Sequence, residues 1–394
     1  MSYVNKEVVP YKTDFREPPS FNQKNFQDLL LESIAQGASD TFLQSGAPVA
    51  AVINGNLLPL TKRRLNAQEV MQILEWVTDQ PSASNAIANG DEVVGSAVVL
   101  HPTRKDSRGD PERCRFRVNG SRIDFRSGVG VQVVMRSIPS SVPSIDGMGL
   151  DQEIIDAITP KDGIVYVTGA TGSGKTTTLA SVLRYIGEGD TPIKGHIMTI
   201  ESPIEFDLST IDSTHSLFSQ SEVGRDTRSF SSGVRSAMRR YPALILIGEI
   251  RDWETASAAM EAAQTGHPSF ATVHTTSVDM IFARILSRCP IELQHSALFD
   301  LITTSRLLIN QTLAKTIDGK RTPLREYLVI TPQIQEELLD VSDPSRITAA
   351  VRNILQREGK TMARAATEAF EKGLISEREL AKHVKSGKGG RANG

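Results

Sequence analysis

The sequence predicts an α/β fold in which a parallel-sheet core is preceded by a smaller α+β domain and followed by C-terminal helices. In residues 151–290, short and nearly continuous apolar runs alternate with helical patterns, as is typical of strands buried on both faces of a parallel sheet. These runs are GIVYVT, GHIMTI, ALILIG and SFATVH. A single core rarely exceeds about 250–300 residues. A chain of 394 residues is therefore expected to contain more than one domain.

The N-terminal part predicts a flexible arm followed by a sheet domain. Residues 1–20 contain several prolines and are expected to form the arm. Residues 21–137 predict the α+β domain, with Gly37 as the C-terminal cap of its first helix. The helices are expected at residues 25–37 and 66–77, and the strands at residues 48–55, 92–100, 114–120 and 129–138.

The linker and the C-terminal part can also be located from composition. Two prolines and two glycines within residues 138–150 predict a linker between the N-terminal domain and the parallel-sheet core of residues 151–290. The patterns that follow the core predict a helical region at residues 291–385. The glycine-rich end, residues 386–394, is expected to be a disordered tail.

Composition narrows the class of protein. An apolar content of 39% and a charged content of 23% fit a globular protein. A formal net charge of −2 creates no basic field, so we expect no direct nucleic-acid binding. The two cysteines, Cys114 and Cys289, exclude a disulfide framework and a four-thiolate zinc site. The charged first twenty residues do not resemble a signal peptide and no run suits a membrane span, so we expect a cytoplasmic protein that reaches membranes only through partners.

The strongest motif is GATGSGKT, residues 169–176, which fits the phosphate-binding pattern G-x-x-x-x-G-K-[ST] between a predicted strand and a predicted helix. Glycines let backbone N–H groups surround phosphate oxygens, and the helix N-terminus favours an anion. In this role Lys175 reaches the β- and γ-phosphates of ATP and the Thr176 hydroxyl helps to hold Mg²⁺. The alternative is a glycine-rich turn without a ligand. The predicted nucleotide-binding residues are Thr171, Gly172, Ser173, Gly174, Lys175, Thr176 and Thr177.

Hydrolysis of a nucleotide also requires carboxylates near the phosphates. Glu249 follows the apolar run ALILIG, whereas Glu201 and Glu205 follow IMTI. The carboxyl ends of parallel strands face a bound nucleotide, so each of these glutamates is a candidate. The alternatives are that Glu249 caps a helix and that the other two are solvated turn residues.

The segment TGHPSFATVHTTS carries His267 and His274 at the two ends of a predicted strand. A strand rises about 3.3 Å per residue, which separates the two histidines by roughly 20 Å and excludes a shared metal ion. His274 is expected at the same sheet edge as the glycine-rich loop, where it could sense the γ-phosphate. His267 would lie at the opposite edge, where it could also be an ordinary polar residue that ends a helix before Pro268.

GATGSGKTTTLAS, TIESPIEF, LILIGEIRDWETA and TGHPSFATVHTTS, in this order, resemble the Walker A, Asp box, Walker B and His box of the secretion ATPase superfamily. This superfamily serves type II and type IV secretion, conjugation, and pilus extension or retraction. The resemblance extends from about residue 116 to residue 379. It implies a RecA-like core, a PAS-like N-terminal domain, ATP and Mg²⁺ as ligands, and a homo-hexamer that acts with inner-membrane complex proteins.

The resemblance also implies roles for individual carboxylates and histidines. Glu205 would activate the attacking water, Glu249 would act on the Mg²⁺ side, and Glu201 would support the Asp box. Ser202 stands where the usual box has an aspartate, so this chain has a hydroxyl group and no carboxylate at that position. His267 belongs to the His box and could face a neighbouring subunit.

Arginines of the N-terminal domain approach the phosphates in this superfamily. Arg126 and Arg136 match those positions best, whereas Arg225 and Arg239 fit less well. The planar guanidinium suits phosphate because it can donate two hydrogen bonds at once. For each of these arginines the alternative is a surface charge.

The branch within the superfamily is suggested by the absence of a zinc loop and by three segments that the sequence contains. Two cysteines exclude the four-cysteine zinc loop that is usual in assembly ATPases. The N-terminal arm, the insert HPTRKDSRGDPERCR and the divergent TIESPIE resemble the type IVB ATPases, such as the Dot/Icm ATPase DotB and the I-type plasmid ATPase TraJ. The segment VRNILQREGKTM keeps a pilus retraction ATPase as the alternative. A weakly hydrolysing scaffold or gating ring and a helicase-like translocase are alternatives of other classes.

Overall fold

The computed structural model describes residues 15–385 except 106–108, 126–127, 140 and 342. The chain forms two units, the first comprising residues 1–141 with 205–210 and the second residues 142–204 with 211–394. Most of the expected arm and the expected tail at 386–394 lie outside the described residues. The remainder of the arm is not free, because the Glu17 carboxylate accepts hydrogen bonds from the backbone N–H groups of Lys62 and Arg63.

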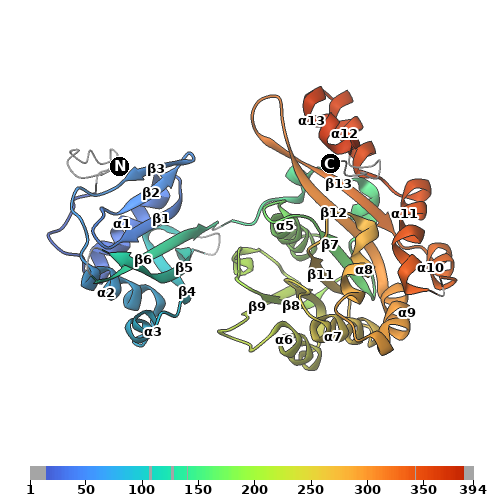
Figure 1. The fold of residues 1–394 in the computed structure, drawn as a ribbon, viewed down its shortest axis with the longest axis horizontal. Coiled ribbons are helices and arrows are strands. Elements are labelled where there is room, and N and C mark those ends of the chain that lie inside the picture. The colour runs from blue at the N-terminus through green and yellow to red at the C-terminus, as the bar shows by residue number, and fades with distance from the viewer. Residues whose placement is uncertain (1–14, 106–108, 126–127, 140, 342, 386–394) are drawn as a thin grey trace. The chain divides into compact units, whose positions relative to one another are not determined.

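The first unit contains an antiparallel sheet with the strand order β3-β2-β1-β6-β5-β4 (Figure 1). Within the described residues three α-helices accompany it, and the predicted helices at residues 25–37 and 66–77 are confirmed. The sequence prediction missed β1, β3 and α3. The elements are α1 (Gln23–Ala35), β1 (Ala38–Gln44), β2 (Ala50–Ile53), β3 (Asn56–Pro59), α2 (Ala67–Thr78), α3 (Ala83–Asn89), β4 (Val93–Lys105), β5 (Pro111–Phe125) and β6 (Gly128–Ile138).

Local sequence explains the ends of the helices in the first unit. The Asn22 side chain accepts the backbone N–H of Asn25 at the start of α1, and Asn66 does the same for Glu69 at the start of α2. Such caps satisfy N–H groups that have no partner within the helix. After α1, Gly37 takes a positive φ of 75°, as expected of a residue that terminates a helix.

The second unit contains a sheet with the strand order β13-β12-β7-β11-β10-β8-β9 (Figure 1). All neighbouring strands pair in parallel except β12 and β13. The four predicted strands of the core correspond to β7, β8, β10 and β11, which confirms the α/β class. The strands are β7 (Ile164–Thr168), β8 (Gly195–Glu201), β9 (Ser216–Glu222), β10 (Pro242–Ile247), β11 (Ser269–Val273), β12 (Ser305–Lys315) and β13 (Arg321–Val329).

Helices of the second unit precede, connect and follow these strands. The α-helices are α4 (Gln152–Ala157), α5 (Lys175–Glu188), α6 (Phe230–Ala237), α7 (Trp253–Gln264), α8 (Ile281–Leu286), α9 (Gln294–Thr304), α10 (Pro332–Leu339), α11 (Ile347–Glu358), α12 (Met362–Glu371) and α13 (Glu377–Lys385). Short 3₁₀ helices include η1 (Ile145–Met148), within the predicted linker, and η4 (Val278–Met280). None of the helices in the described ranges is long and apolar enough to cross a membrane.

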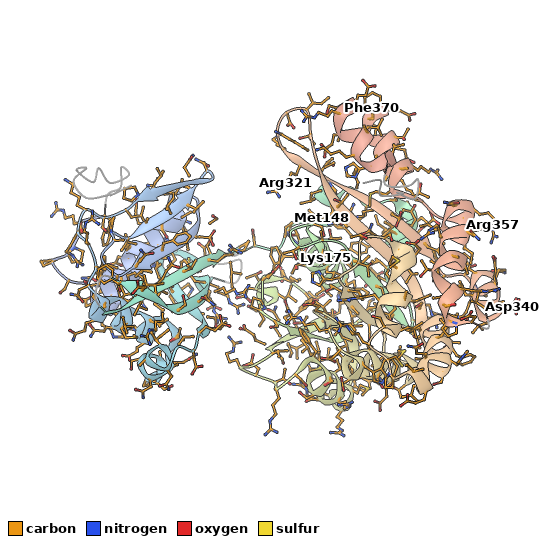
Figure 2. The ribbon with its side chains drawn as sticks, in the orientation of Figure 1. Met148, Lys175, Arg321, Asp340, Arg357 and Phe370 are labelled. Atoms are coloured by element: carbon orange, nitrogen blue, oxygen red, sulfur yellow. The ribbon has the colours of Figure 1, made fainter. Side chains whose placement is uncertain are left out.

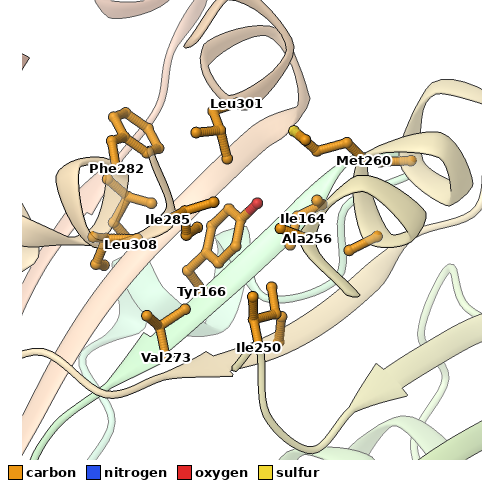
Figure 3. Packing of buried hydrophobic residues seen from close by; sticks show 14 of the residues in the cluster. Ile164, Tyr166, Ile250, Ala256, Met260, Val273, Phe282, Ile285, Leu301 and Leu308 are labelled. Atoms are coloured by element: carbon orange, nitrogen blue, oxygen red, sulfur yellow. The ribbon is translucent and has the colours of Figure 1, made fainter. Parts of the chain in front are cut away.

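The core of the second unit is built around β7. Every residue of β7 is buried, so both faces of the sheet are covered there. On one face the ring of Tyr166 packs among side chains from α7, α8 and α9, including Met260, Phe282 and Leu301 (Figure 3). This burial raises the pKa of the Tyr166 hydroxyl. The near-continuous apolar runs in the sequence therefore reflect strands that are buried on both faces of the sheet, as predicted.

The expectation that residues 291–385 are helical is wrong for residues 305–329, which form β12 and β13. Leu307, Leu308 and Ile309 are at most 1% exposed, and their strand β12 lies between β7 and β13 in the sheet. A short apolar run of this kind has no period that separates a strand from a buried helix. Residues 305–315 form a strand because they pair with β7, and this long-range pairing cannot be read from the local sequence.

Replacement of Leu308 by alanine tests whether β12 belongs to this core. Loss of a fully buried leucine should lower the free energy of unfolding of the second unit by about 2–5 kcal/mol. The chain has two tryptophans, so in a Trp76→Phe background the fluorescence of Trp253, which packs against this core, reports denaturant unfolding of the unit.

The matched control is Ile317→Ala in the turn between β12 and β13, where the side chain is 68% exposed. It should change the free energy of unfolding by less than about 0.5 kcal/mol. Equal effects of the two substitutions would contradict the placement of β12 in the core.

Candidate functional site

The segment between β7 and α5 folds into a tight glycine-rich loop. Gly169, Gly172 and Gly174 have positive φ angles of 145°, 77° and 84°, which side chains disfavour. A Cβ atom at Gly169 would lie 2.3 Å from the carbonyl oxygen of Gln311 on β12. Gly174 precedes α5 and provides no side-chain cap, so the first N–H groups of this helix can serve an anionic ligand.

Two polar side chains of the loop indicate that it fits a phosphate group. The Lys175 ammonium is buried and donates to the carbonyl oxygens of Gly169 at 2.7 Å and Ala170 at 3.1 Å. The Ser173 hydroxyl oxygen is also buried and has no hydrogen-bond partner among the described residues. Leaving such a group without a partner costs about 1–3 kcal/mol, which a bound phosphate oxygen would offset.

The remaining predicted residues of the loop are more accessible. Thr171 and Gly172 are exposed, and Gly174, Thr176 and Thr177 are half-buried around the start of α5. The seven residues predicted to bind nucleotide therefore form one continuous loop and the first turn of a helix. This is the geometry expected of the strand–loop–helix motif.

Glu249 and His274 lie close together at the edge of the sheet where the loop begins. The Nε2 atom of His274 is 3.2 Å from Oε1 of Glu249. Glu249 follows β10 and His274 follows β11, and these two strands pair in parallel. Because β11 also pairs in parallel with β7, the strand that precedes the loop, all three strands end at this edge.

Hydrogen bonds on both sides of Glu249 hold its backbone in place. The N–H group of Ile250 donates to the carbonyl oxygen of Thr272 at 2.9 Å, and the Thr272 hydroxyl donates to the carbonyl oxygen of Gly248. The side chain is held as well, because the guanidinium of Arg251 donates to Oε2 of Glu249 at 2.6 Å. Glu249 is therefore a positioned carboxylate and not a mobile one, and neither contact is a helix cap.

A second threonine holds the backbone on both sides of His274. The hydroxyl of Thr168, the last residue of β7, donates to the carbonyl oxygen of Val273 at 2.6 Å. The same oxygen accepts the N–H of Thr275 at 2.8 Å. Thr168 is fully buried, so these bonds are shielded from water. The imidazole of His274 itself is 40% exposed and accessible to a ligand.

The two glutamates of the predicted Asp box belong to different units. Glu201, at the end of β8, is 6% exposed and accepts hydrogen bonds from Thr199 at 2.5 Å and Gln220 at 2.9 Å. Glu205 is exposed and starts the short segment 205–210 that groups with the first unit. Glu205 thus does not share a unit with the glycine-rich loop.

The predicted arginines differ in their surroundings. Arg126 lies outside the described residues. Arg136 on β6 is exposed, and its Nε atom donates to Asp40 at 2.7 Å within the first unit. Arg225 pairs with the neighbouring Asp226, and Arg239 is exposed. Contact of any of them with phosphate stays a prediction.

His267 precedes β11, at the opposite end of that strand from His274. Its Nδ1 atom lies 3.1 Å from the hydroxyl oxygen of Thr265, just after α7. Among the residues that the structure describes, no group of three or more His, Cys, Asp and Glu side chains could hold a metal ion. The two histidines are therefore separate features, as their spacing predicts.

Sequence reasoning missed several residues that shape this site. Thr168 and Thr272 were missed because their importance comes from backbone groups on other strands, although Thr272 stands inside the quoted segment TGHPSFATVHTTS. Arg251 stands beside Glu249 in the quoted Walker B segment, so its position was a usable signal. Gln311 contacts Ser173 of the loop, and Arg325 contacts Gln311, both from strands that the sequence analysis expected to be helical.

A cavity of about 550 Å³ borders the loop at Ala170 and extends towards α11 and α12. Its wall includes Glu326, which burial gives a raised pKa, and the ion pair between Arg352 and Asp279 at 2.7 Å. None of the predicted site residues lines this cavity. The cavity thus meets the loop only at Ala170 among residues 169–176, and neither Glu249 nor His274 lines it.

The parallel sheet, the glycine-rich loop with its buried lysine, and the positioned carboxylate at the same sheet edge define the class of P-loop ATPases. The family model described as Type II/IV secretion system protein matches residues 106–382. This chain therefore belongs to the Type II/IV secretion ATPase family, whose members bind nucleotide.

Relatives and solved structures agree with this assignment. The type IV pilus retraction ATPase PilT of Pseudomonas aeruginosa is 33% identical over 89% of this chain and 95% of its own length. The structure of the ATPase DotB of Legionella pneumophila is 36% identical, has a TM-score of 0.86, and covers 98% of this chain and 100% of its own. A structure of the pilus retraction motor PilT with bound ADP is 31% identical, has a TM-score of 0.75, and covers 91% of this chain and 96% of its own.

Alanine substitutions at two loop glycines should have unequal effects. A Cβ atom at Gly169 would meet the Gln311 carbonyl oxygen at 2.3 Å and the Ser173 hydroxyl at 2.6 Å, whereas one at Gly172 meets nothing within 4 Å. Gly172→Ala incurs only the cost of the positive φ, about 1 kcal/mol. Gly169→Ala must also displace the loop, so we expect it to weaken binding of a fluorescent ATP analogue by at least about tenfold more.

The measurement is a fluorescence titration on both variants and the parent chain, with circular dichroism to confirm that each is folded. Equal affinities of the two variants would contradict the contact between the loop and β12.

Proposed function

We propose that this chain is a hexameric ATPase that powers a type IVB secretion or conjugative DNA-transfer apparatus at the cytoplasmic face of the inner membrane. The observation that carries the ATPase part is the Glu249–His274 pair, held at the sheet edge where the phosphate-binding loop begins. The similarity to DotB supports the type IVB part. In this role ATP is the substrate and Mg²⁺ the metal ion.

The loop would bind the phosphates of ATP through groups that are poised for them. The Lys175 ammonium would exchange the carbonyl oxygens of Gly169 and Ala170 for phosphate oxygens, and Ser173 would gain the partner that it lacks. Thr176 and Glu249 would hold Mg²⁺, which neutralises phosphate charge when it is bound.

Hydrolysis would require a base for water and a group that responds to the γ-phosphate. Glu205 would take the proton of the attacking water. His274 would donate one hydrogen bond to the γ-phosphate through a ring nitrogen. Glu201, bonded to Thr199 and Gln220, would support the segment that carries Glu205.

Two arginines of the first unit and one histidine of the second unit would complete the site within a ring. Arg126 and Arg136 would approach the phosphates, and Arg136 would exchange Asp40 for a phosphate oxygen. His267, at the opposite end of β11, would face a neighbouring subunit. Rotation of one unit against the next after hydrolysis would then transmit force to an inner-membrane partner.

The similarity figures favour the type IVB branch over pilus retraction. DotB is 36% identical and matches with a TM-score of 0.86, whereas the PilT structure is 31% identical with a TM-score of 0.75. PilT of Pseudomonas aeruginosa nevertheless covers 89% of this chain, so retraction is the second candidate. A gating ring with little hydrolysis is the candidate of another class.

Substitution of Glu205 tests whether the chain hydrolyses ATP as proposed. Loss of a general base lowers kcat by about a hundredfold or more, so Glu205→Gln should abolish most ATP turnover while a fluorescent ATP analogue still binds. His274→Ala should lower kcat by about a hundredfold for loss of one hydrogen-bond donor to the phosphate. The control is Glu371→Gln, an exposed glutamate at the end of α12.

Normal turnover of Glu205→Gln would refute its role as the base. Little turnover by the parent chain, with tight ATP binding, would favour the gating ring. Strong stimulation by DNA would favour a translocase.

A pull-down with the full chain from membrane extracts of its host separates the two branches. With Glu205→Gln to trap bound ATP, we expect recovery of proteins of a type IV secretion coupling complex, identified by mass spectrometry. Lys175→Ala should reduce this recovery, since it removes the principal cation of the loop. Recovery of a pilus platform protein instead would assign the chain to retraction.

A further inference from the structure

Arg325 on β13 is a buried cation surrounded by neutral oxygen atoms. Its side chain is 5% exposed, and it donates to Oε1 of Gln311 at 2.8 Å and to the carbonyl oxygens of Met148 at 2.8 Å and Gly149 at 2.9 Å. Among the described residues no carboxylate forms an ion pair with it. Burial accordingly lowers the pKa of Arg325 to about 10, and the charge of Asp151 opposes this effect. At neutral pH the guanidinium is still charged.

Gln311 on β12 connects this cation to the phosphate-binding loop. Its Oε1 atom accepts both from Arg325 and from the hydroxyl of Thr178 in the first turn of α5, the latter at 2.9 Å. Its Nε2 atom donates to the carbonyl oxygen of Ser173 at 2.8 Å. Its own carbonyl oxygen packs against Gly169 at the start of the loop. Gln311 therefore contacts both ends of the loop.

The other side of Arg325 contacts the segment that enters the second unit. Met148 and Gly149 lie at the end of η1, a few residues after this unit begins at Val142. Helices η1 and α5 are adjacent, and Figure 2 labels Met148 at the end of η1 and Lys175 at the start of α5. The chain of contacts thus runs from the loop through Gln311 and Arg325 to the entry segment.

We propose that Gln311 and Arg325 are positioning residues that hold the phosphate-binding loop ready for ATP and transmit its occupancy to Met148 and Gly149. The inference rests on the proposed function, because it concerns the same ATP site. A buried cation without a counterion is costly, so stability alone does not explain Arg325. A bound polyphosphate would place negative charge on the far side of Gln311 and would offset that cost through a medium of low dielectric constant.

Gln311→Glu separates a positioning role from a structural one. The carboxylate keeps an acceptor for Arg325 and Thr178 and gives the cation a counterion, so the melting temperature without nucleotide should be unchanged or higher. It replaces the donor to Ser173 by an acceptor, which repels the carbonyl oxygen. We therefore expect the Kd for a fluorescent ATP analogue to rise by at least about tenfold. A structural role would move stability and affinity in the same direction.

Arg325→Gln tests the transmission. Arg325 acts on the loop through Gln311, so its loss should weaken the binding of ATP and raise KM by about tenfold. It does not contact the phosphates directly, so kcat should change by less than about twofold. Hydrogen exchange at residues 145–150 should slow when ATP is added to the parent chain and should not slow in this variant. Arg306→Gln is the matched control, since Arg306 on β12 pairs with Asp162 away from the loop and should leave KM unchanged.

The possible failures are distinguishable. If the parent chain itself does not bind ATP, the proposed function and this inference both fail. If it binds ATP but Gln311→Glu binds equally well, or exchange at residues 145–150 still slows in Arg325→Gln, only the positioning role is overturned. Should Arg325→Gln not fold, the opposite responses of stability and affinity in Gln311→Glu decide the question.

Discussion

The parallel pairing of β7, β11, β10 and β8 is the constraint on which the site depends. It brings the carboxyl ends of four strands to one edge, so the segments that follow them become neighbours although they are far apart in sequence. The glycine-rich loop, His274 and Glu249 follow β7, β11 and β10, and Glu201 is the last residue of β8. Hydrogen bonds from Thr168 and Thr272 then tie adjacent segments together. The order of the strands therefore brings the side chains of the site together, and the hydrogen bonds of Thr168 on β7 and Thr272 on β11 hold the segments that carry them in place.

Strands β12 and β13 also contribute residues to the surroundings of the loop. They extend the sheet beyond β7 and place Gln311 against both ends of the loop. Arg325 lies behind Gln311 and reaches the segment that enters the second unit. A loop that must be rigid around phosphates is thus supported from a strand, where side chains are held more firmly than on a loop. The support also offers a route by which nucleotide could affect the entry segment.

The sequence was sufficient for the parts of the molecule that depend on local pattern. Apolar runs predicted β7, β8, β10 and β11, and a motif with fixed spacing predicted the loop from Gly169 to Thr176. It was insufficient where long-range packing decides. Residues 305–315 form a strand because they lie beside β7, and Gln311 meets Ser173 across 138 positions of the chain. The 3.2 Å contact between Glu249 and His274 was predicted only as a shared edge.

The central claim is that the loop and the Glu249–His274 pair form one nucleotide site. A crystal structure of the full chain with Mg²⁺ and a non-hydrolysable ATP analogue tests it most directly. The account predicts that Lys175 leaves the carbonyl oxygens of Gly169 and Ala170 for phosphate oxygens, that the Ser173 hydroxyl gains a partner, and that His274 faces the γ-phosphate. An analogue bound with Lys175 still on those carbonyl oxygens, or with its phosphates away from His274, would contradict the account.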